Sequence, residues 1–351
     1  MLKQFILGLL IIFFVAMSFD SALAKGKNGP LVLQDRGSFY IGGAKVKQDF
    51  IELGSIRADD TVTNNQMFVE YMISAQKPKV PLILVHGAGL TGNSYDTTPD
   101  GRMGWYEYFV RKAFPTYVVD QVGRGRSGFS QAVFNNVGAG RISPSKLPKI
   151  SRMADLHAVW INFRIGPKEG VSYKETQFPI NAISEFSKMS IADLSASLDT
   201  PNPNYKALST LAKKLHGAVL IGHSQSGHYP LESALLAPDY VKGMVVLEGS
   251  CSPRTFDDKD FAIFSKIPLL VIYGDYLQSS TELPFGDSWQ QRYDKCKIFV
   301  DEVNNHGGNA EIVHLPQKGM HGNSHMFMMD KNNLEVADII INWVKKNNIR
   351  Q

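Results

Sequence analysis

Six short, mostly apolar runs constrain the fold of this chain more than any other feature. Each run is too short for a confident helix, and the absence of apolar–polar alternation is typical of a strand covered on both faces. Amphipathic helical segments lie between or after the runs, which predicts a mostly parallel sheet with helices on both faces. The predicted strands are residues 80–85, 115–119, 218–221, 241–247, 268–273 and 310–315, and the predicted helices are residues 105–114, 205–216, 288–303 and 333–346.

Two stretches depart from this alternation. Residues 37–43 and 67–74 are rich in β-branched and aromatic residues between turns, and they predict two early strands. Residues 129–204 show no strand–helix repeat, and a structureless loop of that length is uncommon inside a compact domain. We therefore expect one domain over residues 25–351 with an inserted cap at about 129–204, containing short helices near residues 151–163 and 191–198.

The N-terminus predicts export. Lys3 precedes an apolar run over residues 5–17, and Ala22-Leu23-Ala24 is a small-x-small cleavage pattern, so residues 1–24 are expected to be a signal peptide. The apolar run is shorter than a membrane span requires, so no stable span is expected after cleavage. The predicted location is secreted or periplasmic. In such an oxidising compartment Cys251 and Cys296 form either a disulfide or two buried thiols, and the sequence leaves both open.

The charge pattern argues against a nucleic-acid partner. The net charge is +4 from 37 basic and 33 acidic side chains, and the sequence contains no dense run of Lys and Arg of the kind that binds a phosphate backbone. The sequence predicts no oligomeric state.

The strongest motif is a buried strand that runs into a serine between glycines, Gly222-His223-Ser224-Gln225-Ser226-Gly227. It resembles the nucleophile elbow of the α/β hydrolases, G-x-S-x-G, in which small neighbours permit a sharp turn that exposes the serine. The resemblance implies an α/β-hydrolase fold with Ser224 as nucleophile. The second glycine position holds Ser226, so the turn must accommodate a hydroxymethyl group.

The same resemblance implies an oxyanion hole. His86-Gly87 directly follows a predicted strand, and in this superfamily the backbone N–H after such a pair helps to bind the oxyanion; here that residue is Ala88, and the second donor is Gln225. The turn over residues 120–127 looks like the superfamily's D-x-x-G-x-G-x-S turn and is interpreted as structural. The chain also resembles a branch of secreted bacterial esterases. In part of that branch the oxyanion loop has two adjacent cysteines at the positions of Ala88-Gly89, so the loop of this chain lacks a covalent restraint there.

Two histidines compete for the role of general base, which a serine hydroxyl needs near neutral pH. Both follow the last predicted strand. We favour His325, because the run Gly322-Asn323-Ser324-His325-Met326 resembles the segment around the catalytic histidine of that esterase branch. His321 is the alternative.

Two carboxylates compete for the third position. Asp275 follows a strand at the superfamily's usual place, whereas Glu248 follows the strand directly after the nucleophile. The branch with a similar elbow uses the earlier position, which favours Glu248 and leaves Asp275 as the alternative.

These residue types predict hydrolysis of a small-molecule carboxylic ester through a serine acyl-enzyme. An amidase or peptidase, a C–C hydrolase with the same triad, and a non-catalytic binding protein of the same fold remain alternatives. The C-terminal histidines show no His-Glu-x-x-His pattern, so we expect no metal site, and no cofactor is expected.

Overall fold

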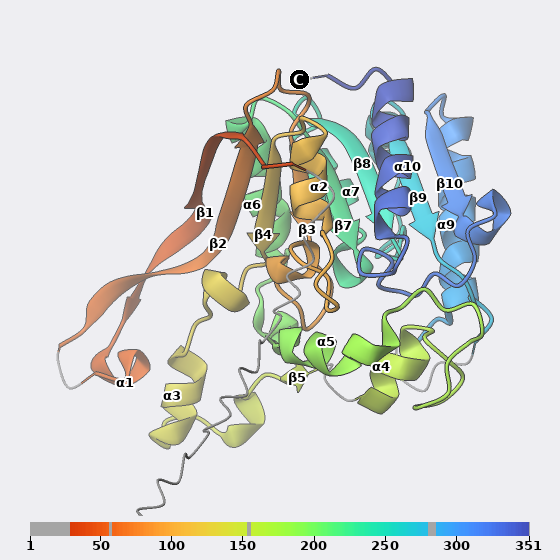
Figure 1. The fold of residues 1–351 in the computed structure, drawn as a ribbon. Helices are drawn as coiled ribbons and strands as arrows, with labels where there is room; N and C mark the ends of the chain where they lie inside the picture. The colour runs from red at the N-terminus through yellow and green to blue at the C-terminus, as the bar shows by residue number, and fades with distance from the viewer. Residues whose placement is uncertain (1–28, 56–57, 153–155, 280–285, 351) are drawn as a thin grey trace, which may run out of the picture.

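A computed structural model describes residues 29–55, 58–152, 156–279 and 286–350, and the predicted signal peptide over residues 1–24 lies outside these ranges. Its centre is an eight-stranded sheet in the order β1-β2-β4-β3-β7-β8-β9-β10 (Figure 1). The strands are β1 (Leu33–Gln48), β2 (Asp60–Ser74), β3 (Leu82–Val85), β4 (Thr116–Asp120), β7 (Ala218–His223), β8 (Val241–Leu247), β9 (Leu269–Tyr273) and β10 (Ala310–His314).

The sheet is parallel from β4 to β10. Within this sheet, as far as its residues are described, the pairs β1–β2 and β2–β4 are antiparallel. The pairs β4–β3, β3–β7, β7–β8, β8–β9 and β9–β10 are parallel. Parallel strands bring their carboxyl ends to one edge, where open sheets of this kind bind ligands. The prediction of a mostly parallel sheet is confirmed.

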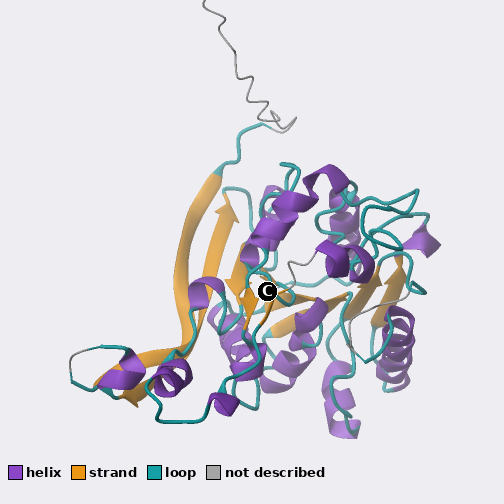
Figure 2. Ribbon diagram, turned by 90° about the horizontal axis from the view of Figure 1, so that it is seen from below, coloured by secondary structure: helices purple, strands orange, loops and turns teal. Residues whose placement is uncertain are grey.

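Helices cover both faces of the sheet, as the view in Figure 2 shows. Alternate β3 residues enter different clusters: Leu82 and Leu84 pack with α2 (Trp105–Arg111) and α10 (Asn333–Lys346). Ile83 and Val85 belong to the second cluster, on the opposite face. That face carries α6 (Pro203–Lys214), α7 (Tyr229–Leu236), α8 (Asp258–Phe264) and α9 (Trp289–Asn305). Burial on both faces explains why the strands are apolar throughout.

The first two strands are longer than predicted. They pair from Leu33 with Ser74 to Gln48 with Asp60 and form a hairpin that projects beyond the other strands (Figure 1). Its outer part is mostly exposed. It therefore lacks the apolar alternation on which the prediction depended.

The segment 129–204 contains α3 (Ala132–Gly138), α4 (Leu156–Asn162), α5 (Ile183–Met189) and a two-stranded ladder of β5 (Ser151–Arg152) with β6 (Ala192–Asp193). It lies below the sheet in Figure 1. The predicted helix near 191–198 is wrong, because β6 and a 3-10 turn at Ser195–Ser197 occupy that stretch. There the Asp193 carboxylate accepts the Ser195 N–H at 2.8 Å, a local bond that competes with helix formation.

A disulfide joins Cys251, just after β8, to Cys296 in α9, which decides between the two alternatives left open by the sequence. Both cysteines are buried. Among the described residues, no helix is both long and apolar enough to cross a membrane.

Candidate active site

Ser224 stands at the end of β7 with φ of +56°, in the left-handed region that a non-glycine residue seldom adopts. The backbone is closely packed just after this turn. A Cβ atom on Gly227 would lie 2.5 Å from the Cα of Gly249, so the elbow and the segment after β8 approach each other at glycines. Such strain at a strand end is typical of functional sites.

Ser226, the departure from the G-x-S-x-G pattern, is accommodated by hydrogen bonds. Its hydroxyl lies 2.9 Å from the carbonyl oxygen of Val85, to which it donates, and accepts the N–H of His223 at 3.0 Å. The buried hydroxyl is therefore satisfied and connects β7 to the end of β3.

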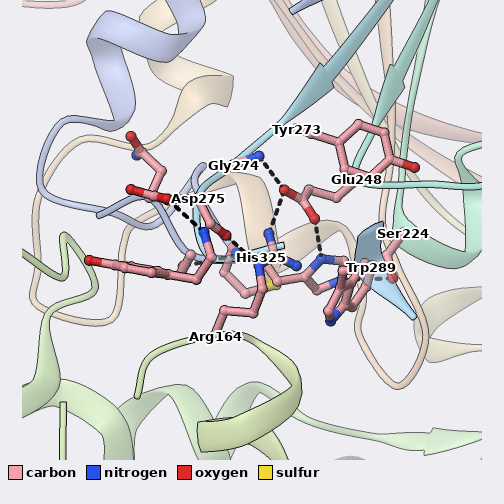
Figure 3. Close-up of polar contacts among 12 residues, drawn as sticks. Arg164, Ser224, Glu248, Tyr273, Gly274, Asp275, Trp289 and His325 are labelled. Carbon is pink, nitrogen blue, oxygen red and sulfur yellow. Dashed lines mark hydrogen bonds and ion pairs between the residues drawn. The ribbon is translucent and has the colours of Figure 1, made fainter. Parts of the chain in front are cut away.

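A relay of hydrogen bonds joins three of the predicted site residues (Figure 3). Nε2 of His325 lies 2.9 Å from Oγ of Ser224, and Nδ1 of His325 lies 3.1 Å from Oε2 of Glu248. The imidazole of His325 is buried. Its ring centroid lies 4.4, 4.7 and 5.0 Å from the ring centroids of Trp289, His223 and Phe163, respectively. Burial lowers the pKa of His325 below its ordinary value, although Glu248 acts to raise it.

Glu248 is fixed from its other side. Its Oε1 lies 2.6 Å from Nη2 of Arg164, with both side chains fully buried, and it also accepts the N–H of Gly274. Burial alone would raise the pKa of Glu248, but Arg164 and His325 outweigh burial and lower it to about 2. The carboxylate is therefore ionised near neutral pH.

The alternative base and acid pair with each other. Nδ1 of His321 lies 3.7 Å from Oδ2 of Asp275, and the histidine side chain is 53% exposed. Asp275 accepts the N–H of Gly322 at 2.9 Å, and its carbonyl oxygen accepts Nε of Arg164. The structure thus brings His325 and Glu248, rather than His321 and Asp275, to Ser224.

The loop that carries His325 is anchored on both sides of the histidine. Buried Asp330 accepts the N–H and the hydroxyl of Ser324 at 2.8 and 2.7 Å, and burial raises the pKa of Asp330 to about 6 despite these bonds. His223, in the elbow, donates Nε2–H to the carbonyl oxygen of His325 at 2.9 Å. The segments that carry Ser224 and His325 are therefore joined by a direct hydrogen bond.

The predicted oxyanion donors flank the elbow. Ala88 follows β3, Gln225 follows Ser224, and both are partly exposed. A Cβ atom on Gly87 would lie 3.0 Å from Cβ of Ser224, so a side chain at this position would crowd the elbow. The turn over residues 120–127 supports this loop, since the Gln121 N–H donates to Nε2 of His86 at 3.0 Å.

Three charged residues beside the site have no part in the sequence prediction: Arg164, Asp193 and Arg124. Arg124 lies in the turn at 120–127, which could have pointed to it. Arg164 and Asp193 lie in the segment 129–204, where no motif or period marks them. Among the described residues, no group of three or more His, Cys, Asp or Glu side chains is placed to hold a metal ion.

Comparisons with known proteins point in one direction. No family model matches the chain. A solved structure described as a novel bacterial esterase is 41% identical, with a TM-score of 0.84 over 91% of this chain and 98% of that one. A probable secreted lipase, phiG, from a fungus (Fungal sp. strain ATCC 74256) is 26% identical over 326 residues, which are 79% of this chain and 85% of the lipase.

Proposed function

This chain belongs to the esterases of the α/β-hydrolase superfamily, and on that premise we propose that it cleaves carboxylic esters through an acyl-enzyme on Ser224. The observation that carries the proposal is the relay from Ser224 through His325 to Glu248, with contacts of 2.9 and 3.1 Å. A hydroxyl, an imidazole and a buried carboxylate in this order are what a serine nucleophile requires.

In the proposed reaction, Nε2 of His325 takes the proton of Ser224 while Oγ attacks the ester carbonyl carbon. The negative charge that forms on the carbonyl oxygen is stabilised by the N–H groups of Ala88 and Gln225. His325 then gives its proton to the leaving alcohol, and the acyl group stays on Ser224. Water, deprotonated by His325, then attacks the acyl carbon. The bond from that carbon to Oγ of Ser224 breaks, His325 returns the proton to Oγ, and the acid leaves. Glu248 accepts Nδ1–H throughout and stabilises the imidazolium.

The segment 129–204 and the N-terminus complete the proposal. We propose that the segment is a cap, since Phe163 packs against the His325 ring and Ile191 binds the loop after β3. Export is supported by the pattern over residues 1–24, by the disulfide and by a relative named as a secreted lipase.

The first test is covalent labelling. We expect a fluorophosphonate to modify Ser224 and to abolish hydrolysis of p-nitrophenyl esters of graded acyl length, with the adduct located by mass spectrometry. Ser224→Ala should lose label and lower kcat by more than about 10³-fold, because the nucleophile is removed. An active enzyme that is labelled at another residue would contradict the proposal.

The second test separates the two histidines. His325→Ala should lower kcat about as much as Ser224→Ala, since residues that act as a unit give non-additive losses. His321→Ala is the matched control and should stay near wild-type activity, because its side chain is exposed and pairs with Asp275. The reverse order of losses would assign the base to His321.

A further inference from the structure

The loop that carries Ala88 is held by the segment 129–204. The N–H of Gly89 donates to Oδ2 of Asp193 at 3.1 Å, and the carbonyl oxygen of Gly89 accepts the N–H of Ile191 at 2.8 Å. The peptide groups on both sides of Gly89 are therefore fixed from outside the loop. The first of them joins Ala88 to Gly89 and directly follows the Gly87–Ala88 peptide, which carries the proposed donor, the N–H of Ala88.

The second proposed donor is held by the same carboxylate. Nε2 of Gln225 lies 3.3 Å from Oδ2 of Asp193 and 3.3 Å from Oγ of Ser195. Its Oε1 accepts Nη1 of Arg124 at 2.7 Å. Oδ2 of Asp193 thus contacts both Gly89 and Gln225, which follow β3 and β7 respectively.

Arg124 and Asp193 form a buried ion pair. Nη2 of Arg124 lies 2.9 Å from Oδ1 of Asp193, and the two side chains are 0% and 3% exposed. Burial alone would raise the pKa of Asp193, but Arg124 and the N–H groups of Ser195 and Gly89 outweigh burial, so the pKa lies below its ordinary value. The carboxylate is therefore ionised, and its charge beside the oxyanion hole is balanced by Arg124.

We propose that Asp193, paired with Arg124, is a positioning residue that sets the distance between the two oxyanion donors. The inference rests on the proposed function, because it assumes that Ala88 and Gln225 bind the oxyanion. Asp193 itself acts through Gly89 and the Gln225 side chain rather than on the substrate. Donors that stabilise a developing charge work only when they are held in place beforehand, and non-covalent contacts from the segment 129–204 supply that restraint here.

The test compares Asp193→Ala and the isosteric Asp193→Asn with Asp199→Asn. Asp199 lies in the same segment, but its side chain is exposed and accepts a hydrogen bond from Nδ2 of Asn65. Rates are expressed per active site titrated with a fluorophosphonate, so unfolded protein does not count. We expect kcat to fall about 10- to 100-fold in Asp193→Ala, and less in Asp193→Asn, with KM changed less than twofold, because misplaced donors affect the transition state most.

A second measurement is specific to the oxyanion hole. Sulfur is larger and accepts hydrogen bonds more weakly than oxygen, so a well-formed hole favours an ester over the matching thionoester. We expect the ratio of kcat/KM for the ester to that for the thionoester to fall in both Asp193 variants and to stay at the wild-type value in Asp199→Asn. A merely structural role would lower the melting temperature and leave this ratio unchanged.

The inference is overturned if Asp193→Asn and Asp199→Asn have the same kcat per titrated site and the same ratio. In that case wild-type turnover and Ser224 labelling remain, so the failure concerns Asp193 alone. A wild-type enzyme that hydrolyses esters without labelling at Ser224 would overturn the proposed function, and this inference with it.

Discussion

Ser224 and Glu248 both have positive φ angles, +56° and +53°, directly after the neighbouring strands β7 and β8. The elbow motif was enough to predict Ser224 as the candidate nucleophile, because a sharp turn after a strand requires small residues beside the serine, and these can be recognised in the sequence. The acid could not be decided in this way, since Glu248 and Asp275 both follow strands. What separates them in the structure is the histidine that each one contacts: Glu248 lies 3.1 Å from Nδ1 of His325, whereas Asp275 lies 3.7 Å from Nδ1 of His321. The choice between them stays a prediction until it is tested.

The pH profile of kcat/KM tests the acid. The pKa of His325 is lowered by burial, and a neutral imidazole is the base, so the acid limb should lie below the ordinary histidine value of 6.5. Glu248→Gln removes the carboxylate that raises this pKa, so both the apparent pKa of the acid limb and kcat/KM should fall. Asp275→Asn is the matched control and should leave the limb in place. A shift in Asp275→Asn alone would assign the acid to Asp275.

At the scale of elements, the sequence predicted the buried strands and the long helices well, because burial on two faces leaves a continuous apolar run. α9 shows how local chemistry adds to this: it begins after Ser288, whose hydroxyl accepts the N–H of Gln291. Prediction failed where elements are stabilised by other means. The outer part of the β1–β2 hairpin has little apolar patterning, and β6 replaces the helix expected near 191–198.

The elbow predicts a steep cost for a single methyl group. In Gly227→Ala the new Cβ would meet the Gly249 backbone at 2.5 Å, so β7 and β8 must separate at their ends. We expect a loss of about 1–3 kcal/mol in unfolding free energy and reduced kcat. Gly138→Ala in α3, where no atom lies within 4 Å of the added Cβ, is the control and should change the free energy by less than about 1 kcal/mol. Urea unfolding measures both, and equal stabilities would contradict the packing argument.

For the whole molecule, the α/β-hydrolase fold and the assignment as an ester hydrolase were predictable and are confirmed, since they depend on a repeated pattern and one strong motif. The disulfide was not decided by the sequence, because two cysteines 45 residues apart satisfy either state. The site residues that come from the segment 129–204 were missed, because tertiary contacts rather than local patterns bring them to the sheet.

The disulfide should contribute strongly to stability. It closes a loop of 45 residues, for which the chain-entropy model gives about 4 kcal/mol. Reduction, or the double substitution Cys251→Ser with Cys296→Ser, should lower the unfolding free energy by about that amount in urea titrations. Thiol counting verifies that the bond is open. An unchanged midpoint in verified reduced protein would show that the bond adds no stability.

The buried bond between Arg164 and Glu248 limits how this enzyme can be re-engineered. Lids are natural targets for exchange between esterases when a different acyl preference is wanted. In this protein a chimera that replaces residues 129–204 as one module also removes Arg164, the cation that pairs with the carboxylate of Glu248, the proposed triad acid. A transplanted segment must therefore bring an equivalent arginine, and on the proposed mechanism a hybrid without it loses turnover together with its old selectivity.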